Sequence, residues 1–411
     1  MSQKNDTVSC RSCSSSNLTT VLDLGETPLA DRMPSKEQLA EPEPKFPLEV
    51  AFCEDCALVQ ILETVPPEVL FCDDYPYFSS FSDTLLEHSR ANVEELIEWR
   101  SLGPDSLVVE LASNDGYLLQ YYKQHGVAVL GIDPADGPAQ KAIEKGIPTE
   151  IAFFTKQFAA QLASTGKLAD VIHANNVLAH VADTNGFVSG IAALLKPEGV
   201  AVIEHPYVRD LVEKNEFDTI YHEHLCYFSV TALDNLFRRH GLYLQDIRRL
   251  SIHGGSLRSY VGKSDTPSGA VIRILEEERE LGLDRVGYYS AFSSRVRKVC
   301  ADLLQLLTQL KANGASIAAY GAAAKGSTLI NVVGIGKDLL NFVVDRNIHK
   351  QGLFMPGQQI PILDPSELLA QMPDYTLILP WNFADEILEQ QSQYRESGGK
   401  FIIPIPEPKI L

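Results

Sequence analysis

Four cysteines near the start of the chain form two C-x-x-C pairs, Cys10 with Cys13 and Cys53 with Cys56. A two-residue gap lets both thiolates of a pair face one ion, and four thiolates complete the tetrahedron that Zn²⁺ prefers. No coordination position remains for water, so the pattern indicates a structural site. A redox role fits less well, because redox C-x-x-C motifs rarely come in two copies beside polar loops. We therefore predict one structural zinc ion bound by these four residues.

A second group of ionisable side chains lies in the segments 204–207 and 221–224. The H-E-x-x-H spacing of zinc proteases is absent, which makes a catalytic metal the less favoured interpretation. General-base chemistry needs a neutral imidazole oriented by a neighbouring group, and His224 with Glu223 supplies these residue types. Neighbours on a strand point to opposite faces, so in an extended segment Glu223 orients a different group. His180 could join the same site or be a structural histidine.

The segment from Val109 to Gly116 reads as the turn between a strand and a helix, where an open α/β sheet binds nucleotide-like ligands. Its glycine spacing does not match the pyrophosphate fingerprint G-x-G-x-x-G, which favours an uncharged ligand group beside the turn. Asp133 ends the next strand, where a carboxylate can accept both hydroxyls of a ribose. The residues that predict an adenosine site are Glu110, Ala112, Asn114, Gly116 and Asp133.

Two asparagines follow a later strand on the same edge of the predicted sheet. Asn175 and Asn176 could face the cofactor or the substrate, or they could simply form a turn.

The elements that must position these residues alternate from about residue 93 onward. Short apolar runs at 106–112, 127–133, 170–176 and 199–204 predict buried parallel strands. Helical spacing at 93–99, 117–123, 140–145 and 187–195 predicts the helices before and between them. This alternation predicts βαβ units in a doubly wound sheet, an α/β fold.

Three flanking regions complete the predicted organisation. The proline-rich stretch between Cys13 and Cys53 is expected to loop out from the metal site. Residues 271–313 have helical spacing that ends at Gly314, which predicts a long packing helix. Strand patterns at 315–320, 340–345 and 376–379 predict a second, smaller α/β domain.

The length and net charge of the chain limit the classes of protein to which it can belong. A chain of 411 residues suggests about two to four domains. The formal net charge of −19 disfavours non-specific binding to nucleic acid or to an anionic membrane surface. We see no apolar signal-peptide core and no run approaching about 18 apolar residues. We therefore expect a cytoplasmic protein that binds neither nucleic acid nor membrane.

Taken together, several motifs resemble those of the sugar C-methyltransferases, which act on nucleotide-linked deoxy-keto-sugars. The turn 109–116 departs from the usual E-x-G-x-G-x-G of class I methyltransferases at two glycines. The motifs that carry the resemblance are Cys10-Arg-Ser-Cys13, Leu22-Asp-Leu-Gly25-Glu-Thr-Pro28, Val109 to Gly116, Tyr221-His-Glu-His224, His253-Gly-Gly-Ser-Leu-Arg258 and Tyr320-Gly-Ala-Ala-Ala-Lys325-Gly.

The resemblance implies a fold of three parts, with S-adenosylmethionine as cofactor. A zinc-binding domain spans 1–80, a class I methyltransferase domain of the Rossmann-like, doubly wound type spans 81–265, and a Rossmann-like domain that helps hold a sugar nucleotide spans 266–411.

The resemblance also implies a reaction and residue roles. A methyl group is transferred to C3 of a nucleotide-linked 4-keto-deoxysugar through an enolate. His224 is the expected base, Tyr221, Glu223 and His180 line the same pocket, and Tyr75 or Tyr77 faces the substrate unless both only pack under a loop. The nucleotide is expected to be thymidine diphosphate, with Arg258 and Lys325 as the cations for its diphosphate, in a monomeric enzyme. The expected substrate-binding residues are His205, Tyr207, His222, His253, Ser256, Arg258 and Lys325.

Two alternatives stand beside this hypothesis. An NAD-dependent oxidoreductase acting on a nucleotide sugar could use the two Rossmann-like turns, although they lack the pyrophosphate glycine spacing. A non-catalytic zinc-ribbon protein could bind a sugar nucleotide with a degenerate cofactor site.

Overall fold

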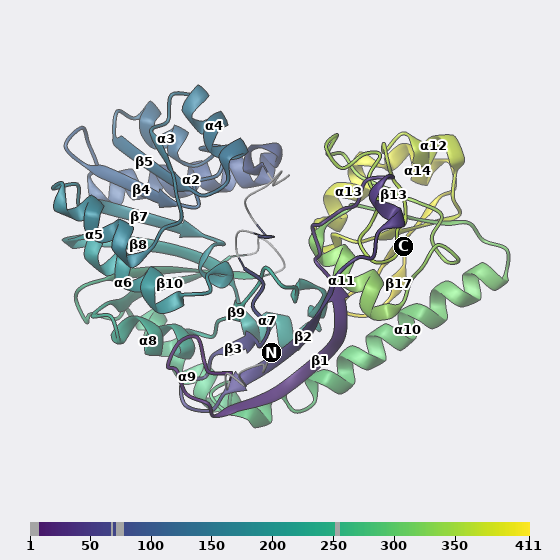
Figure 1. Ribbon diagram of the computed structural model, residues 1–411, viewed down its shortest axis with the longest axis horizontal. Coiled ribbons are helices and arrows are strands. Elements are labelled where there is room, and N and C mark those ends of the chain that lie inside the picture. The colour runs from purple at the N-terminus through teal and green to yellow at the C-terminus, as the bar shows by residue number, and fades with distance from the viewer. Residues whose placement is uncertain (1–7, 67–68, 71–77, 251–254) are drawn as a thin grey trace.

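Three sheets organise the chain in a computed structural model that describes residues 8–66, 69–70, 78–250 and 255–411 (Figure 1). Tyr75, Tyr77 and His253, which the sequence analysis assigned to the site, lie outside these ranges. No helix within these ranges is long and apolar enough to span a bilayer.

The central sheet has seven strands in the order β10-β11-β8-β7-β4-β5-β6. The pairs among β4, β5, β6, β7 and β8 are parallel, whereas β11 is antiparallel to both of its neighbours. The four predicted strands are therefore confirmed, and three more, β6, β10 and β11, join them. The bounds are β4 Leu107–Leu111, β5 Ala128–Asp133, β6 Thr149–Ile151, β7 Ala169–Asn175, β8 Leu195–Pro206, β10 Tyr243–Leu250 and β11 Ser256–Gly262.

Helices cover both faces of this sheet because its strands are apolar on both sides. Val108 and Val171 pack with α2 and α3 in one core, whereas Val109 and Ile172 point to the opposite core with α6. A doubly wound α/β domain results, as predicted. The helices of this part are α2 Asp83–Arg100, α3 Leu119–Gln124, α4 Asp136–Glu144, α5 Lys156–Ser164, α6 Thr184–Leu194, α7 Val208–Glu213 and α8 Val230–Arg238.

The N-terminal part is a four-stranded antiparallel sheet, β1 Leu18–Pro28, β2 Lys45–Cys53, β3 Val59–Ile61 and β9 Cys226–Tyr227. The expectation that residues 14–52 loop out was wrong, because β1 and β2 form a long hairpin that reaches the C-terminal part (Figure 1). Its tip docks there: the Phe354 amide donates to the Pro34 carbonyl at 3.0 Å and the Gly357 amide to Glu43 Oε2 at 2.7 Å.

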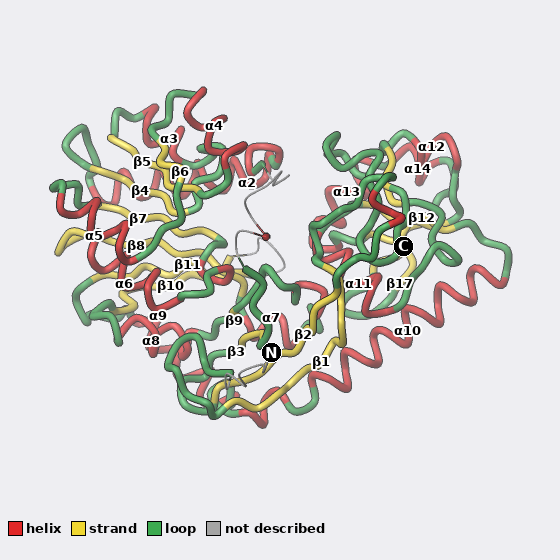
Figure 2. Tube along the Cα trace, in the orientation of Figure 1, coloured by secondary structure: helices red, strands yellow, loops and turns green. Residues whose placement is uncertain are grey.

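The stretch 271–313 forms two helices, α9 Gly269–Leu281 and α10 Phe292–Ala312, rather than one. Gly282 ends α9 in the left-handed conformation at φ 82°, which is a common helix C-cap. Helix α10 then runs along the β1–β2 hairpin toward the C-terminal part (Figure 2).

A second, smaller α/β domain follows, as predicted. Its sheet has the order β14-β13-β12-β15-β16-β17, and the strands other than β17 pair in parallel. The bounds are β12 Ile317–Tyr320, β13 Val343–Val344, β14 Ile362–Leu363, β15 Tyr375–Ile378, β16 Lys400–Ile403 and β17 Lys409–Ile410, with α11 Ala324–Val333, α12 Glu367–Gln371, α13 Ala384–Gln390 and α14 Ser392–Glu396.

Candidate functional site

The four predicted zinc ligands come together. Cys10 Sγ lies 3.5 Å from Cys56 Sγ, Cys13 Sγ lies 3.5 Å from Cys53 Sγ, and all four sulfur atoms lie within 4.8 Å of one another. A zinc tetrahedron with bonds of about 2.3 Å has edges of about 3.8 Å, so this arrangement fits the ion with little movement. Four thiolates close the coordination shell, which makes the site structural.

The four-cysteine site is fixed to the central α/β domain by hydrogen bonds around it. Asn235 Nδ2 in α8 donates to the Cys56 carbonyl at 3.2 Å. Asn185 Nδ2 in α6 donates to the carbonyls of Arg11 and Ser12 at 2.8 and 3.0 Å. The zinc site therefore orients the N-terminal sheet on helices α6 and α8.

The predicted cofactor turn follows β4 and has an unusual backbone. Ala112, Asn114 and Gly116 have φ values of 56°, 49° and 75°, all in the left-handed region. Non-glycine residues rarely adopt it, and they occupy the two positions where the sequence departs from the glycine pattern. At Gly116 a Cβ would lie 2.3 Å from Ile147 Cδ1, so this position needs glycine. The turn keeps the shape of a glycine-rich loop without two of its glycines.

Asp133, at the end of β5, holds this turn in place. Its Oδ2 accepts the Asn114 amide at 2.7 Å and its Oδ1 accepts the Ala135 amide at 2.8 Å. Burial raises the pKa of Asp133, and these two hydrogen bonds oppose the rise. A carboxylate has about four acceptor positions, so two remain for the hydroxyls of a ribose.

Two further acceptors fit the cationic end of S-adenosylmethionine. Burial raises the pKa of Glu110 well above its usual range, and the Asp133 charge adds to the rise. The buried Asn175 Oδ1, at the end of β7, has no hydrogen-bond partner within the described ranges. Asn176 turns the chain at φ 53°, and its amide donates to the Glu204 carbonyl at 2.8 Å. The donor and acceptor set therefore fits this cofactor.

The predicted base, His224, has a hydrogen-bond partner at each ring nitrogen. His224 Nδ1 lies 2.7 Å from the Thr219 carbonyl, and His224 Nε2 lies 2.9 Å from the Tyr221 hydroxyl. A carbonyl only accepts, so Nδ1 carries the proton, and in the neutral ring Nε2 accepts from Tyr221. The His180 ring lies edge-on, 4.7 Å from the His224 ring. Burial lowers the pKa of His180 to about 4, so this ring is neutral near pH 7. Tyr221, His224 and His180 are thus brought together.

Glu223 is buried in the turn that precedes His224. The segment is a turn closed by the bond from the His224 amide to the Tyr221 carbonyl at 2.9 Å, not the strand considered from the sequence. Burial raises the pKa of Glu223 well above its usual range; the Asp31 charge adds to the rise and Lys350 opposes it. These neighbours come from the N-terminal hairpin and from the C-terminal domain, so three parts of the chain converge at this turn.

A short segment links the cofactor turn to the C-terminal domain. The Ser79 amide donates to Asn114 Oδ1 at 2.9 Å, and Lys145 Nζ donates to Ser80 Oγ at 3.1 Å. The Phe78 ring lies 6.3 Å from the ring of His349, which follows β13. The cofactor turn therefore lies next to the C-terminal domain along this segment.

Three predicted substrate-binding side chains bind other parts of the protein. Arg258 Nε pairs with Glu204 Oε1 at 2.6 Å inside the sheet, the Tyr207 hydroxyl donates to Glu278 Oε1 at 2.9 Å, and His222 Nε2 lies 3.1 Å from the Pro47 carbonyl. The charge of Arg258 is thus paired with a buried carboxylate, and its contact with a diphosphate stays a prediction.

His205 and Ser256 occupy adjoining strands. His205, on β8, is buried, and burial lowers its pKa to about 4. Ser256 begins β11 and is also buried. Contact of either residue with a substrate stays a prediction.

Lys325, at the start of α11, also has protein partners. Its Nζ donates to Asn382 Oδ1 at 2.7 Å and lies 4.6 Å from the centroid of the Trp381 ring. Burial lowers its pKa, whereas the charges of Asp218 and Glu216 raise it. Lys325 therefore lies near two acidic residues of the central domain, and its contact with a diphosphate stays a prediction.

Sequence reasoning missed Asp31, Lys350 and Trp381. Trp381 offered a signal, because it is one of two tryptophans and directly follows a predicted strand of the C-terminal sheet. Asp31 and Lys350 offered none, since their neighbours come from distant parts of the chain.

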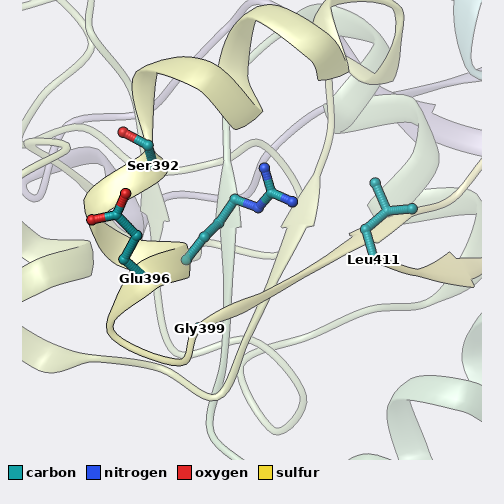
Figure 3. A pocket seen from close by; sticks show the side chains of 5 residues that line it. Ser392, Glu396, Gly399 and Leu411 are labelled. Atoms are coloured by element: carbon teal, nitrogen blue, oxygen red, sulfur yellow. The ribbon is translucent and has the colours of Figure 1, made fainter.

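A shallow pocket of about 420 Å³ lies elsewhere in the C-terminal domain, between Ser392, Arg395, Glu396, Gly399 and Leu411 (Figure 3). None of the predicted site residues lines it.

Comparison with known proteins agrees with this organisation. Family models match three consecutive stretches: a zinc binding domain at residues 10–71, a methyltransferase domain at 85–247 and a C-methyltransferase C-terminal domain at 251–406. The chain is 36% identical to C-methyltransferase NovU from Streptomyces niveus over 405 residues, which are 98% of this chain and 96% of that protein.

Two solved structures that the chain resembles each cover less than half of it. PH0226 protein from Pyrococcus horikoshii OT3 covers 46% of this chain and 98% of its own at 15% identity, with a TM-score of 0.36. Magnesium protoporphyrin IX methyltransferase from Synechocystis PCC 6803 covers 44% of this chain and 83% of its own at 16% identity, with a TM-score of 0.35. These low scores add nothing to the topology described above. The full-length relative and the three family models together show that the chain belongs to the S-adenosylmethionine-dependent C-methyltransferases that carry a zinc-binding domain.

Proposed function

We propose that this enzyme methylates C3 of a nucleotide-linked 4-keto-deoxysugar through an enolate. The observation that carries the proposal is the Tyr221–His224 pair, at a turn where all three parts of the chain meet. A carbon nucleophile needs a base and a donor for the developing oxyanion, and this pair contains both. The 36% identity to a C-methyltransferase over nearly the whole chain supports carbon as the acceptor.

His224 removes the C3 proton, which the neighbouring C4 ketone acidifies. Its Nε2 holds the lone pair because Nδ1 donates to Thr219. The C3–H group takes the place of the Tyr221 hydroxyl at Nε2, and the released hydroxyl donates to the ketone oxygen as charge develops there. Loss of one such donor typically costs about 10²- to 10³-fold in rate. His180 stays neutral beside the imidazole and adds no opposing charge when His224 becomes protonated.

The cofactor is held by the turn after β4. Asp133 accepts the ribose hydroxyls, and Glu110 with Asn175 accepts hydrogen bonds from the methionine part. Bound S-adenosylmethionine supplies the electrophilic methyl group.

The nucleotide lies at the carboxyl edge of the C-terminal sheet. There Asp345 Oδ2 accepts the Ala322 amide at 2.6 Å and Oδ1 accepts the Asn347 amide at 2.7 Å. Asp133 makes the same two contacts in the first sheet, so this second turn is also suited to accept a hydroxyl of a nucleoside pentose. Lys350 Nζ, which donates to the Ala322 carbonyl at 2.7 Å, supplies a cation beside the diphosphate. We propose thymidine diphosphate as the nucleotide.

The test measures the base and the transfer separately. The zinc-loaded enzyme is incubated in D₂O with a thymidine-diphosphate-linked 4-keto-deoxysugar and S-adenosylhomocysteine, and deuterium at C3 is followed by NMR. We expect enzyme-dependent exchange and, with S-adenosylmethionine, a product with a new carbon-bound methyl group.

His224→Gln should slow the exchange by about 10²- to 10⁴-fold. The control is His125→Gln, which alters an exposed histidine in the same domain. Methylation at oxygen or nitrogen, or NADH-dependent reduction of the ketone without methylation, would contradict the proposal.

A further inference from the structure

The carbonyl that orients His224 belongs to a short element held by the C-terminal domain. Thr219 is the last residue of the 3₁₀ helix η4 Phe217–Thr219, which packs against α11. Its carbonyl lies 2.7 Å from His224 Nδ1. The middle residue of η4, Asp218, is fully buried. The position of Asp218 therefore fixes the position of the carbonyl that follows it.

Asp218 is bound by a tryptophan from the C-terminal domain. Trp381 Nε1 donates to Asp218 Oδ2 at 2.7 Å. The ring of Trp381 is itself held from above by Lys325 Nζ, 4.6 Å from the ring centroid. Burial raises the pKa of Asp218 to about 6, and the positive charge of Lys325 opposes this rise. Trp381 and Lys325 come from one edge of the C-terminal sheet, where β15 and β12 end.

We propose that Trp381 is a positioning residue for the reaction: through Asp218 and η4 it holds the Thr219 carbonyl on His224 and keeps Nε2 as the unprotonated nitrogen. The proposal rests on the function proposed above for His224. It also assigns Lys325 a supporting role for Trp381.

The physical reason is the small energy difference between the two neutral tautomers of histidine. Either ring nitrogen can carry the proton, and the partner of the other nitrogen decides which one does. One hydrogen bond to a fixed carbonyl stabilises the Nδ1–H tautomer. If the carbonyl is displaced, this stabilisation is lost and the Nε2–H tautomer becomes populated. Because Trp381 lies in the C-terminal domain, the base is correctly oriented only when that domain is docked.

The first test reads the tautomer directly and needs no sugar substrate. The full-length, zinc-loaded protein is labelled with ¹⁵N-histidine, and the His224 ring signals are assigned by their loss in His224→Gln. Wild type should show a single form protonated at Nδ1. Trp381→Phe, which keeps an aromatic side chain but removes the indole N–H, should show a second tautomer. Trp99→Phe changes the other tryptophan, half of which is exposed on α2, and should leave the signals unchanged.

The second test measures methyl transfer. Loss of an orienting contact behind a reactive group typically costs about 10- to 100-fold, so kcat of Trp381→Phe should fall by that factor, with the affinity for S-adenosylmethionine unchanged. Asp218→Asn keeps an oxygen acceptor and should retain more activity than Asp218→Ala.

An unchanged His224 tautomer in Trp381→Phe, or equal losses in Asp218→Asn and Asp218→Ala, would overturn the inference. A wild-type enzyme that shows the expected tautomer but does not methylate the sugar would instead refute the proposed function.

Discussion

Glu216 provides a stability test at the junction between the methyltransferase and C-terminal domains. Its side chain is 4% exposed and precedes η4, and the nearest cation, Lys214 Nζ, lies 4.0 Å from Oε1. Burial raises the pKa of Glu216 from 4.5 to about 7, a rise that Lys214 and Lys325 oppose. The folded protein therefore favours the neutral carboxyl, and Glu216→Gln mimics that form at every pH.

The sign and size of the effect follow from linkage. Because the folded pKa lies above the unfolded one, the contribution of the neutral carboxyl is complete below pH 4.5 and is lost as pH rises to about 7. A rise from 4.5 to about 7, at about 1.4 kcal/mol for each pKa unit, corresponds to about 3 kcal/mol. We expect Glu216→Gln to be more stable than the parent protein by up to about 3 kcal/mol at pH 8 and equal to it near pH 4.5.

Urea unfolding followed by Trp381 fluorescence, with Trp99 replaced by Phe in both proteins, reports on this junction. The pH dependence of the midpoint is compared with that of Glu389→Gln, which changes an exposed glutamate of the C-terminal domain. A stability difference that does not change with pH, or a glutamine variant that is less stable at pH 8, would show that nearby lysines outweigh burial.

Three more predictions follow from the other sites. Cys53→Ser should lower the zinc content from about one ion per chain and loosen residues 10–61, as measured by metal analysis and hydrogen exchange, because one ligand of the tetrahedron is lost. Burial raises the pKa of Glu110, and binding of cationic S-adenosylmethionine should lower it again, so binding should release protons and tighten as pH rises through that pKa, whereas Glu110→Gln should abolish the release; calorimetry in buffers of different ionisation enthalpy measures it. Arg258→Met should destabilise the protein by up to about 3 to 5 kcal/mol in thermal unfolding, because the buried Glu204 loses the guanidinium and keeps only the ring of His88 as a partner, and Glu204→Leu in the same chain should recover part of the loss.

The methyltransferase sheet was predictable because each of the four predicted strands can be recognised from its own residues. Each is a short apolar run buried on both faces, and the helices between them keep the 3.6-residue period. The zinc site was equally predictable, since the type and spacing of its four cysteine ligands are typical of structural zinc sites. The β1–β2 hairpin was missed because its prolines suggested a loop. Pro28 ends β1 and Pro47 lies in β2, so only the context of the finished sheet shows that both are tolerated.

The site was predictable in its residue types but not in its partners. His224 and Tyr221 are three residues apart, and a turn brings their side chains together. Arg258 looked like an open cation, yet pairing of β8 with β11 sets it directly opposite Glu204. Contacts of this kind depend on strand order and domain docking, and neither produces a periodic pattern in the sequence. The same holds for Trp381 and Asp218, which are 163 positions apart.

The two α/β domains have the same pair of aspartate–amide hydrogen bonds at corresponding positions. Asp133 ends β5 and Asp345 directly follows β13. Each accepts an amide from the turn after the first strand of its sheet and a second amide two residues downstream. One edge suits the adenosine of the cofactor, and the other suits the nucleoside of the proposed substrate. The turn that carries His224 lies beside Lys350, which contacts the second edge, and the segment 78–82 contacts both domains. Transfer from a nucleoside-linked methyl donor to the proposed nucleotide-linked sugar requires their reactive ends to meet away from both nucleosides. The turn at Tyr221–His224 is where these contacts converge.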